Sequence, residues 1–171
     1  MHAEQLAFCE RVKNIFPHKF AGQDVLEIGS QNINGSVREL FSGGQYLGID
    51  LGEGKDVDLV CSGKDYKRDI PFDVIISCEC LEHDREYAAT VKNAIRLLKS
   101  GGLLLLTMAS HERPEHGTHL SAAFASPHTL NHYKNIYLED LAPLCAWERV
   151  FFPYCFEYGG VFDLYFYGIK R

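Results

Sequence analysis

The chain has 171 residues, 46% of them hydrophobic, which is enough for one domain with a sizeable core and too little for two. Its 23 acidic residues outnumber its 17 lysines and arginines, and no long basic run could follow a phosphate backbone, so a nucleic-acid partner is disfavoured. The longest apolar run is strand-sized and the first 20 residues lack the apolar core of a signal peptide, so we expect a cytoplasmic protein without a membrane partner.

The first half of the chain alternates between helical and strand patterns. Apolar residues at helical spacing predict a helix over residues 3–16, within a leading segment 1–20, and Pro17 ends it. A short strand over 25–29 follows, then a polar turn and a helix over 35–41. Further strands are predicted over 46–50, 57–61 and 72–78.

The second half continues this alternation and is interrupted once. It predicts a helix from Tyr87 to Lys99, a strand over 103–108 and a helix over 137–146. Two aromatic strands joined at Gly159–Gly160 follow, and the final strand, 161–169, is predicted to be antiparallel to its neighbours. Residues 109–135 form a long loop rich in His, Ser and Pro, which we interpret as a lid or wall of an acceptor site. The whole predicts one α/β domain over 1–171, with a doubly wound, mostly parallel sheet and helices on both faces.

The first strand and its turn, residues 27–35, lie where such sheets bind nucleotides. The G-x-G-x-x-G pattern and the P-loop lysine are both missing, so a phosphate ligand is disfavoured. Glu27 stands two positions before Gly29, and Asp50 ends the next strand, where an acid can accept both ribose hydroxyls. Glu27 suits a cofactor that carries an ammonium and a sulfonium. The alternative to a cofactor site is that Gly29 only allows a helix to pack closely and that Glu27 and Asp50 are solvated. The position of both acids at matching ends of their strands disfavours this alternative.

Five segments in order resemble class I S-adenosylmethionine-dependent methyltransferases. They are Val25–Gly29, Gly48–Asp50, Phe72–Ser77, Leu81–His83 and Leu97–Leu103. The resemblance implies a Rossmann-like, seven-stranded sheet with an antiparallel last strand, and S-adenosylmethionine as the cofactor.

The resemblance also implies cofactor-binding residues. Gly29 and Ser30 would border the methionine moiety, Asp50 would hold the ribose, Ser62–Gly63 would flank the adenine, and Cys78–Glu79 would close the pocket beneath the sulfonium. The full expected set is Glu27, Gly29, Ser30, Gln31, Asp50, Leu51, Ser62, Gly63, Cys78 and Glu79. Two departures stand out: Gln31 and Ile33 replace the usual later glycines, and Ser62–Gly63 replaces the commoner acid.

The segment 79–83 allows two interpretations. Its acidic residues and histidine could join His116 or His119 in a magnesium-like site, as in some small-RNA and quinone-pathway O-methyltransferases that it resembles. The Leu-Glu-His signature is also widespread among relatives in which no metal is implied, where the histidine lines the cleft. We favour the metal-free interpretation; the metal-bound alternative would use Glu79, Glu82 and His83.

Five of the eight histidines fall in or beside the long loop. Histidine can take a proton from an acceptor hydroxyl near neutral pH, so His83 and His116 are candidate catalytic residues, although most loop histidines are merely solvated.

These observations predict in-line transfer of a methyl group from S-adenosylmethionine to a small-molecule acceptor, by O-methylation, in a monomer or homodimer. One alternative is a metal-assisted RNA or quinone O-methyltransferase. Another is an S-adenosylmethionine-binding module without catalysis.

Overall fold

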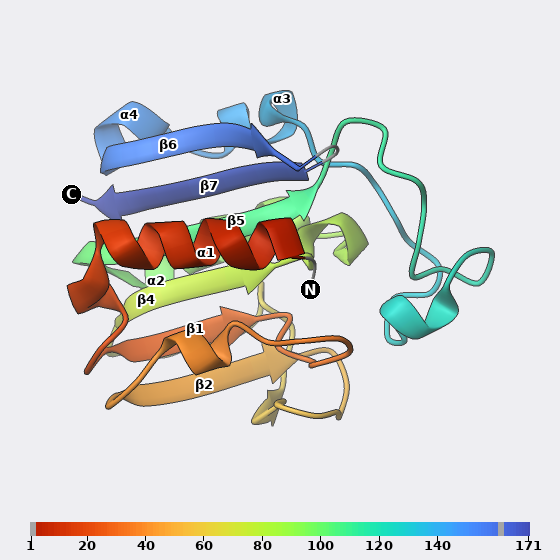
Figure 1. Ribbon diagram of the computed structural model, residues 1–171, viewed down its shortest axis with the longest axis horizontal. Helices are drawn as coiled ribbons and strands as arrows, with labels where there is room; N and C mark the ends of the chain where they lie inside the picture. The colour runs from red at the N-terminus through yellow and green to blue at the C-terminus, as the bar shows by residue number, and fades with distance from the viewer. Residues whose placement is uncertain (1–2, 161–162) are drawn as a thin grey trace.

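The structure is a computed structural model that describes residues 3–160 and 163–171. Its centre is a seven-stranded sheet in the order β3-β2-β1-β4-β5-β7-β6. β1 to β5 run parallel, and β7 pairs antiparallel with both β5 and β6, so its arrow points the opposite way in Figure 1. The strands are β1 (Asp24–Ile28), β2 (Gln45–Asp50), β3 (Leu59–Val60), β4 (Phe72–Cys78), β5 (Leu98–Ala109), β6 (Phe151–Gly159) and β7 (Asp163–Lys170). The predicted fold class is confirmed; the predicted start of the last strand, Val161, lies outside the described residues.

One face of the sheet is covered by α1 (Ala3–Ile15), which crosses in front of β4 and β5 in Figure 1. Phe8, Cys9 and Val12 point inward from it and are buried in one core cluster with Val74 and Leu105. Pro17, the first residue of the 3-10 turn η1 (Pro17–Lys19), follows the helix, as the sequence predicts.

The opposite face is covered by α2 (Tyr87–Leu97), α3 (Leu138–Leu141) and α4 (Trp147–Val150). Trp147 is the centre of this layer: its indole nitrogen donates to the Leu141 carbonyl at 2.9 Å, and its ring lies 4.8 Å from that of Phe166. Phe151, Phe156 and Phe166 of β6 and β7 therefore serve core packing on this side. Two core clusters on opposite faces hold one sheet between helical layers.

Two predicted helices are wrong in extent. Residues 35–41 contain only the 3-10 turn η2 (Arg38–Leu40), and Gly35, with φ +132°, lies outside helical geometry. The predicted helix 137–146 stops at Leu141 and continues as the 3-10 turn η5 (Ala142–Leu144), because Pro143 supplies no N–H for an α-helical bond.

Two predicted strands differ in length. The strand expected over 57–61 is reduced to the exposed β3, two residues long. β5 begins at Leu98 rather than at 103, so the last two residues of the predicted helix 87–99 belong to this strand. Its pairing with β4 shifts between Leu98 and Leu103, so Gly101 and Gly102 lie in an irregular part of the strand. Along the described part of the chain, no helix is both long and apolar enough to span a bilayer.

The packing of α1 predicts a large loss of stability when its central contact is removed. Phe8 is 1% exposed and stacks on Tyr165 with ring centroids 4.6 Å apart. We expect Phe8→Ala to lower the free energy of unfolding by about 3–5 kcal/mol, measured by denaturant unfolding. Ile15→Ala in the same helix is the control, because Ile15 is 48% exposed and its truncation should cost much less. Equal losses in the two variants would contradict this account of α1.

Candidate active site

The carboxyl ends of β1, β2 and β4 meet at one edge of the sheet and open into two adjoining cavities. Parallel pairing sets Glu27 of β1 beside Gly48 of β2 and Ile76 of β4. Beyond these strand ends lie a cavity of about 640 Å³ and a smaller one of about 90 Å³. Both are lined by Gly29, Gln31 and Glu79, so they form one continuous site.

All ten expected cofactor-binding residues and both candidate catalytic histidines line one or both of these cavities, whereas Glu82 and His119 line neither. The large cavity is lined by Glu27, Gly29, Ser30, Gln31, Cys78, Glu79, His83 and His116. The small cavity is lined by Gly29, Gln31, Asp50, Leu51, Ser62, Gly63, Glu79 and His83.

Glu27 is a buried acid at the end of β1. It is 5% exposed, and one of its oxygens accepts a hydrogen bond from the Tyr46 hydroxyl at 3.0 Å. Burial raises the pKa of Glu27 from 4.5 to about 8, although the Tyr46 hydrogen bond and the charge of Arg38 oppose the shift. Ionised Glu27 therefore lacks a full counter-charge, which a cationic ligand group could supply.

Asp50 organises the turn between the two cavities. One of its oxygens accepts a hydrogen bond from the backbone N–H of Gln31 at 3.0 Å, and the other accepts one from the N–H of Leu51 at 2.7 Å. These two bonds tie the loop after β1 to the end of β2. The carboxylate stays partly exposed at the wall of the small cavity.

Position 29 needs a glycine because of its backbone conformation and the close approach of Cys80, as well as because it lines the cavity. Its φ is +80°, and a Cβ placed on it would lie 2.5 Å from the Cβ and Sγ of Cys80. A larger residue here would strain the backbone and displace Cys80 before it filled the ligand space. Substitution of Gly29 is therefore a poor test of ligand binding.

Glu79 follows β4 in a strained conformation, with φ +50°. One carboxylate oxygen accepts from the Thr107 hydroxyl at 3.2 Å, and the other lies 3.4 Å from a guanidinium nitrogen of Arg113. Burial raises the pKa of Glu79 from 4.5 to about 7; the nearby Asp163 adds to the shift and Arg113 opposes it.

Several lining residues come from parts of the chain that no sequence motif marks. Gln5 of α1 donates to the Thr107 hydroxyl, and Asp163 at the start of β7 pairs with Arg113. Glu4 and Gly160 also line the large cavity. No local pattern identifies these residues, because only the packing of α1 and the β6–β7 hairpin brings them to the strand ends.

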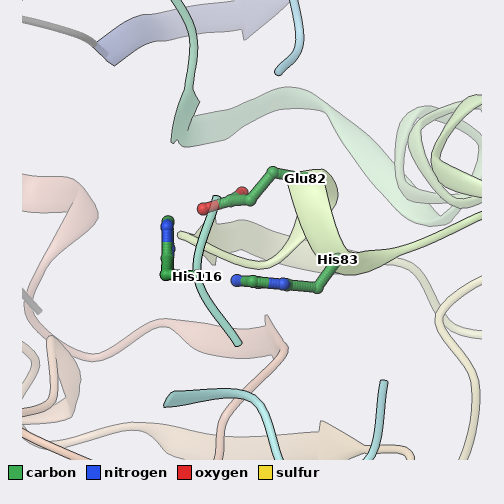
Figure 2. Close-up of side chains that lie close together, drawn as sticks. All are labelled: Glu82, His83 and His116. Carbon is green, nitrogen blue, oxygen red and sulfur yellow. The ribbon is translucent and has the colours of Figure 1, made fainter. Parts of the chain in front are cut away.

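Two histidines and a glutamate converge beside Glu79. Glu82 and His83 lie on the 3-10 turn η3 (Leu81–His83), and His116 comes from the long loop, with the two imidazole centroids 5.0 Å apart (Figure 2). Burial, reinforced by the charge of His116, lowers the pKa of His83 from 6.5 to about 4, and burial also lowers the pKa of His116. Neutral rings of this kind are weak general bases at neutral pH.

The long loop, which extends beyond the strand ends in Figure 1, is anchored at its return to the sheet. The N–H of Lys134 donates to the Glu82 carbonyl at 2.9 Å, and the N–H of Ile136 donates to the Ala109 carbonyl at 2.8 Å. Gly117, with φ +68°, lets the backbone pass so close to His83 that a Cβ would lie 2.7 Å from its ring. Ala125, in the 3-10 turn η4 (Ala123–Ala125), lines both cavities, as expected for a wall over the site.

This strand order, with an antiparallel β7 and a cavity at the carboxyl ends of β1, β2 and β4, defines the class I methyltransferase fold. A family model described as a methyltransferase domain matches residues 2–142. The chain belongs to this methyltransferase family, as its motifs predicted. Comparison with curated proteins finds no match.

Solved structures agree on the fold. The chain is similar to Burkholderia thailandensis 1,6-didemethyltoxoflavin-N1-methyltransferase, with TM-score 0.69 and 15% identity over 98% of this chain and 78% of that one. It is also similar to Haemonchus contortus phosphoethanolamine N-methyltransferase 2, with TM-score 0.64 and 19% identity over 94% of this chain. It spans only about half of that protein, 51%. A third is magnesium protoporphyrin IX methyltransferase from Synechocystis PCC 6803, with TM-score 0.63 and 11% identity over 97% of this chain and 79% of that one.

The buried Glu27 predicts a specific dependence of stability on pH. Between pH 4.5 and about 8 the folded chain retains a proton on Glu27 that the unfolded chain has released, so Glu27 makes the protein less stable as the pH rises. Relative to wild type, we expect the free energy of unfolding of Glu27→Gln to rise across this window by at most about 1.4 kcal/mol for each pH unit. Denaturant unfolding of both proteins at several pH values measures the difference. A difference that stays constant with pH would mean that Glu27 titrates normally.

Proposed function

We propose that the chain binds S-adenosylmethionine and transfers its methyl group to an oxygen of a small-molecule acceptor. The observation that carries this proposal is the continuous pair of cavities at the ends of β1, β2 and β4. The large cavity, about 640 Å³, lies within the range of roughly 300–1,000 Å³ that is usual for small-molecule sites.

The described residues offer partners for each part of the cofactor. Ser30 is 2% exposed, lines the large cavity, and its hydroxyl has no hydrogen-bond partner among the described residues, so it is available to an amino-acid carboxylate. The carboxylate of Glu27 suits the ammonium of the same moiety. Asp50 suits the ribose hydroxyls, and the walls formed by Leu51, Ser62 and Gly63 suit the adenine.

The small cavity, about 90 Å³, is well below the usual size of a ligand site, so the nucleoside needs more room than the loop leaves. Residues 125–129 of the long loop form the outer wall of this cavity. We propose that this segment moves outward to admit the cofactor and closes over it. Such closure would exclude water from the reacting atoms.

When bound, the cofactor supplies an electrophilic methyl group on a sulfonium that leaves as a neutral thioether. Cys78 and Glu79 line the wall beside this position, and the acceptor would occupy the rest of the large cavity near His83 and His116. Most of the acceleration would come from holding the two reacting atoms in line in a dry site. Help with the acceptor proton is required because a hydroxyl is a weak nucleophile.

Loss of the Asp50 carboxylate should weaken cofactor binding. We expect Asp50→Ala to raise the dissociation constants of S-adenosylmethionine and S-adenosylhomocysteine by about 10- to 100-fold, because charge-assisted hydrogen bonds to the ribose are lost. Asp50→Asn, which keeps one acceptor oxygen, should have a smaller effect. Isothermal titration calorimetry measures both. The control is Glu53→Ala, which removes an equal charge from an exposed position nearby; unchanged affinity in Asp50→Ala would refute the ribose assignment.

Turnover tests the reaction itself. With a panel of small hydroxyl compounds and matching amines, we expect release of S-adenosylhomocysteine together with an O-methylated product, both followed by mass spectrometry. Methylation of the amines alone would overturn the choice of oxygen. Cofactor binding without turnover on any compound would favour the binding module over the enzyme.

A further inference from the structure

The cluster of Glu82, His83 and His116 has the composition of a metal site. Each residue offers one ligand atom, and these three atoms lie within 4.8 Å of one another. Figure 2 shows the carboxylate of Glu82 and the ring of His83 extending from the same turn toward His116, which reaches them from the long loop. Residues far apart in the sequence therefore converge on one point.

The carboxylate of Glu82 is the observation that requires explanation. Glu82 is 0% exposed, and neither of its oxygens has a hydrogen-bond partner among the residues that the structure describes. Such a buried group costs several kcal/mol unless something compensates it. The guanidinium of Arg113 is already engaged with Asp163 and lies 3.4 Å from Glu79. A cation at the cluster would supply the missing partner.

The two imidazoles are prepared for the same role. The Nδ1 atom of His116 lies 3.1 Å from the carbonyl oxygen of Pro114. A carbonyl can only accept, so Nδ1 carries the proton and Nε2 keeps its lone pair. This arrangement is usual for histidines that bind metals, in which a backbone carbonyl fixes the ring. The Nδ1 atom of His83 is buried and has no hydrogen-bond partner in the described part of the chain.

We propose that Glu82, His83 and His116 bind one divalent transition-metal cation, such as Zn²⁺ or Mn²⁺, at the acceptor end of the large cavity. Two imidazoles and one carboxylate suit such ions better than Ca²⁺ or Mg²⁺, which prefer oxygen ligands. Metal–ligand bonds of about 2.0–2.2 Å would draw the three residues slightly closer together. Three protein ligands leave coordination positions open, and His83 and His116 line the cavity, so these positions face the acceptor.

A cation at Glu82, His83 and His116 differs from the interpretation of segment 79–83 that the sequence favoured, in which His83 lines a metal-free cleft. Of the loop histidines considered as partners, His116 lies at the cluster, whereas His119 is exposed. Glu79 is held instead by Thr107 and Arg113.

The consequence for the reaction rests on the proposed function. A cation beside the acceptor lowers the pKa of a hydroxyl bound to it. The proton of that hydroxyl passes to solvent water before the loop closes, and the oxygen electron pair then forms the bond to the methyl carbon. The electron pair of the broken bond between the methyl carbon and the cofactor sulfur stays on sulfur. The cation thus supplies the activation that a hydroxyl acceptor requires.

Metal binding can be measured without turnover. Untagged full-length protein, stripped with EDTA and dialysed, is titrated with ZnCl₂, MnCl₂ and MgCl₂ by calorimetry. We expect one Zn²⁺ or Mn²⁺ per chain, with weaker binding of Mg²⁺. Glu82→Gln and His116→Ala should weaken binding on the order of 100-fold, whereas His119→Ala, an exposed histidine of the same loop, should not change it.

Each result decides the proposal. No saturable metal binding to wild type, or equal binding to wild type and both ligand variants, would overturn the proposal. The buried Glu82→Gln variant could fail to fold, but His116→Ala changes a loop residue and therefore still tests the site. Binding of S-adenosylmethionine in the presence of EDTA separates the two hypotheses. If the cofactor binds and no metal does, only the cation site fails. If the metal binds and the cofactor does not, the proposed function fails.

Discussion

The site depends on the parallel pairing of β1, β2 and β4, because this pairing ends three strands at one edge of the sheet. Glu27, Asp50 and Glu79 all leave the sheet there. α1 and the β6–β7 hairpin then cover the same edge from one side with Gln5 and Asp163. If the strands were out of register, these acids would not share a cavity.

Gathering several acids at one edge of the sheet is costly, and the structure compensates three of them in different ways. Glu27 has the Tyr46 hydroxyl, Asp50 has two backbone amides, and Glu79 has Thr107 and Arg113. Glu82 has no comparable partner among the described residues. Together they make the cavity walls favourable to positive charge, which fits a cofactor with an ammonium and a sulfonium, and a metal cation beside it.

The long loop connects these features. Its return at Lys134 and Ile136 is fixed to η3 and to the end of β5, while its middle forms the walls of both cavities. Because His116 belongs to this loop, a metal ion at the cluster would also hold the loop over the site. Cofactor entry, acceptor binding and metal binding would then be coupled through one segment.

Local signals in the sequence determined the strand and helix pattern, the family and the strand-end residues of the site. Glu27, Gly29 and Asp50 could be found because parallel strands place their carboxyl ends together whatever the details of packing. The sequence was less informative where backbone geometry decides, as at the short turn η2 and the interruption of 137–146 by Pro143.

Only the tertiary structure decided which distant groups complete the site. The roles of Gln5, Arg113 and Asp163 depend on packing across the sheet, which leaves no periodic signal. The choice of His116 over His119, and the lack of a described partner for Glu82, depend on the path of a loop without regular structure. Hydrogen-bond satisfaction is a property of three-dimensional neighbours, so the sequence offered a metal site only as an alternative, and the observation that favours it came from the structure.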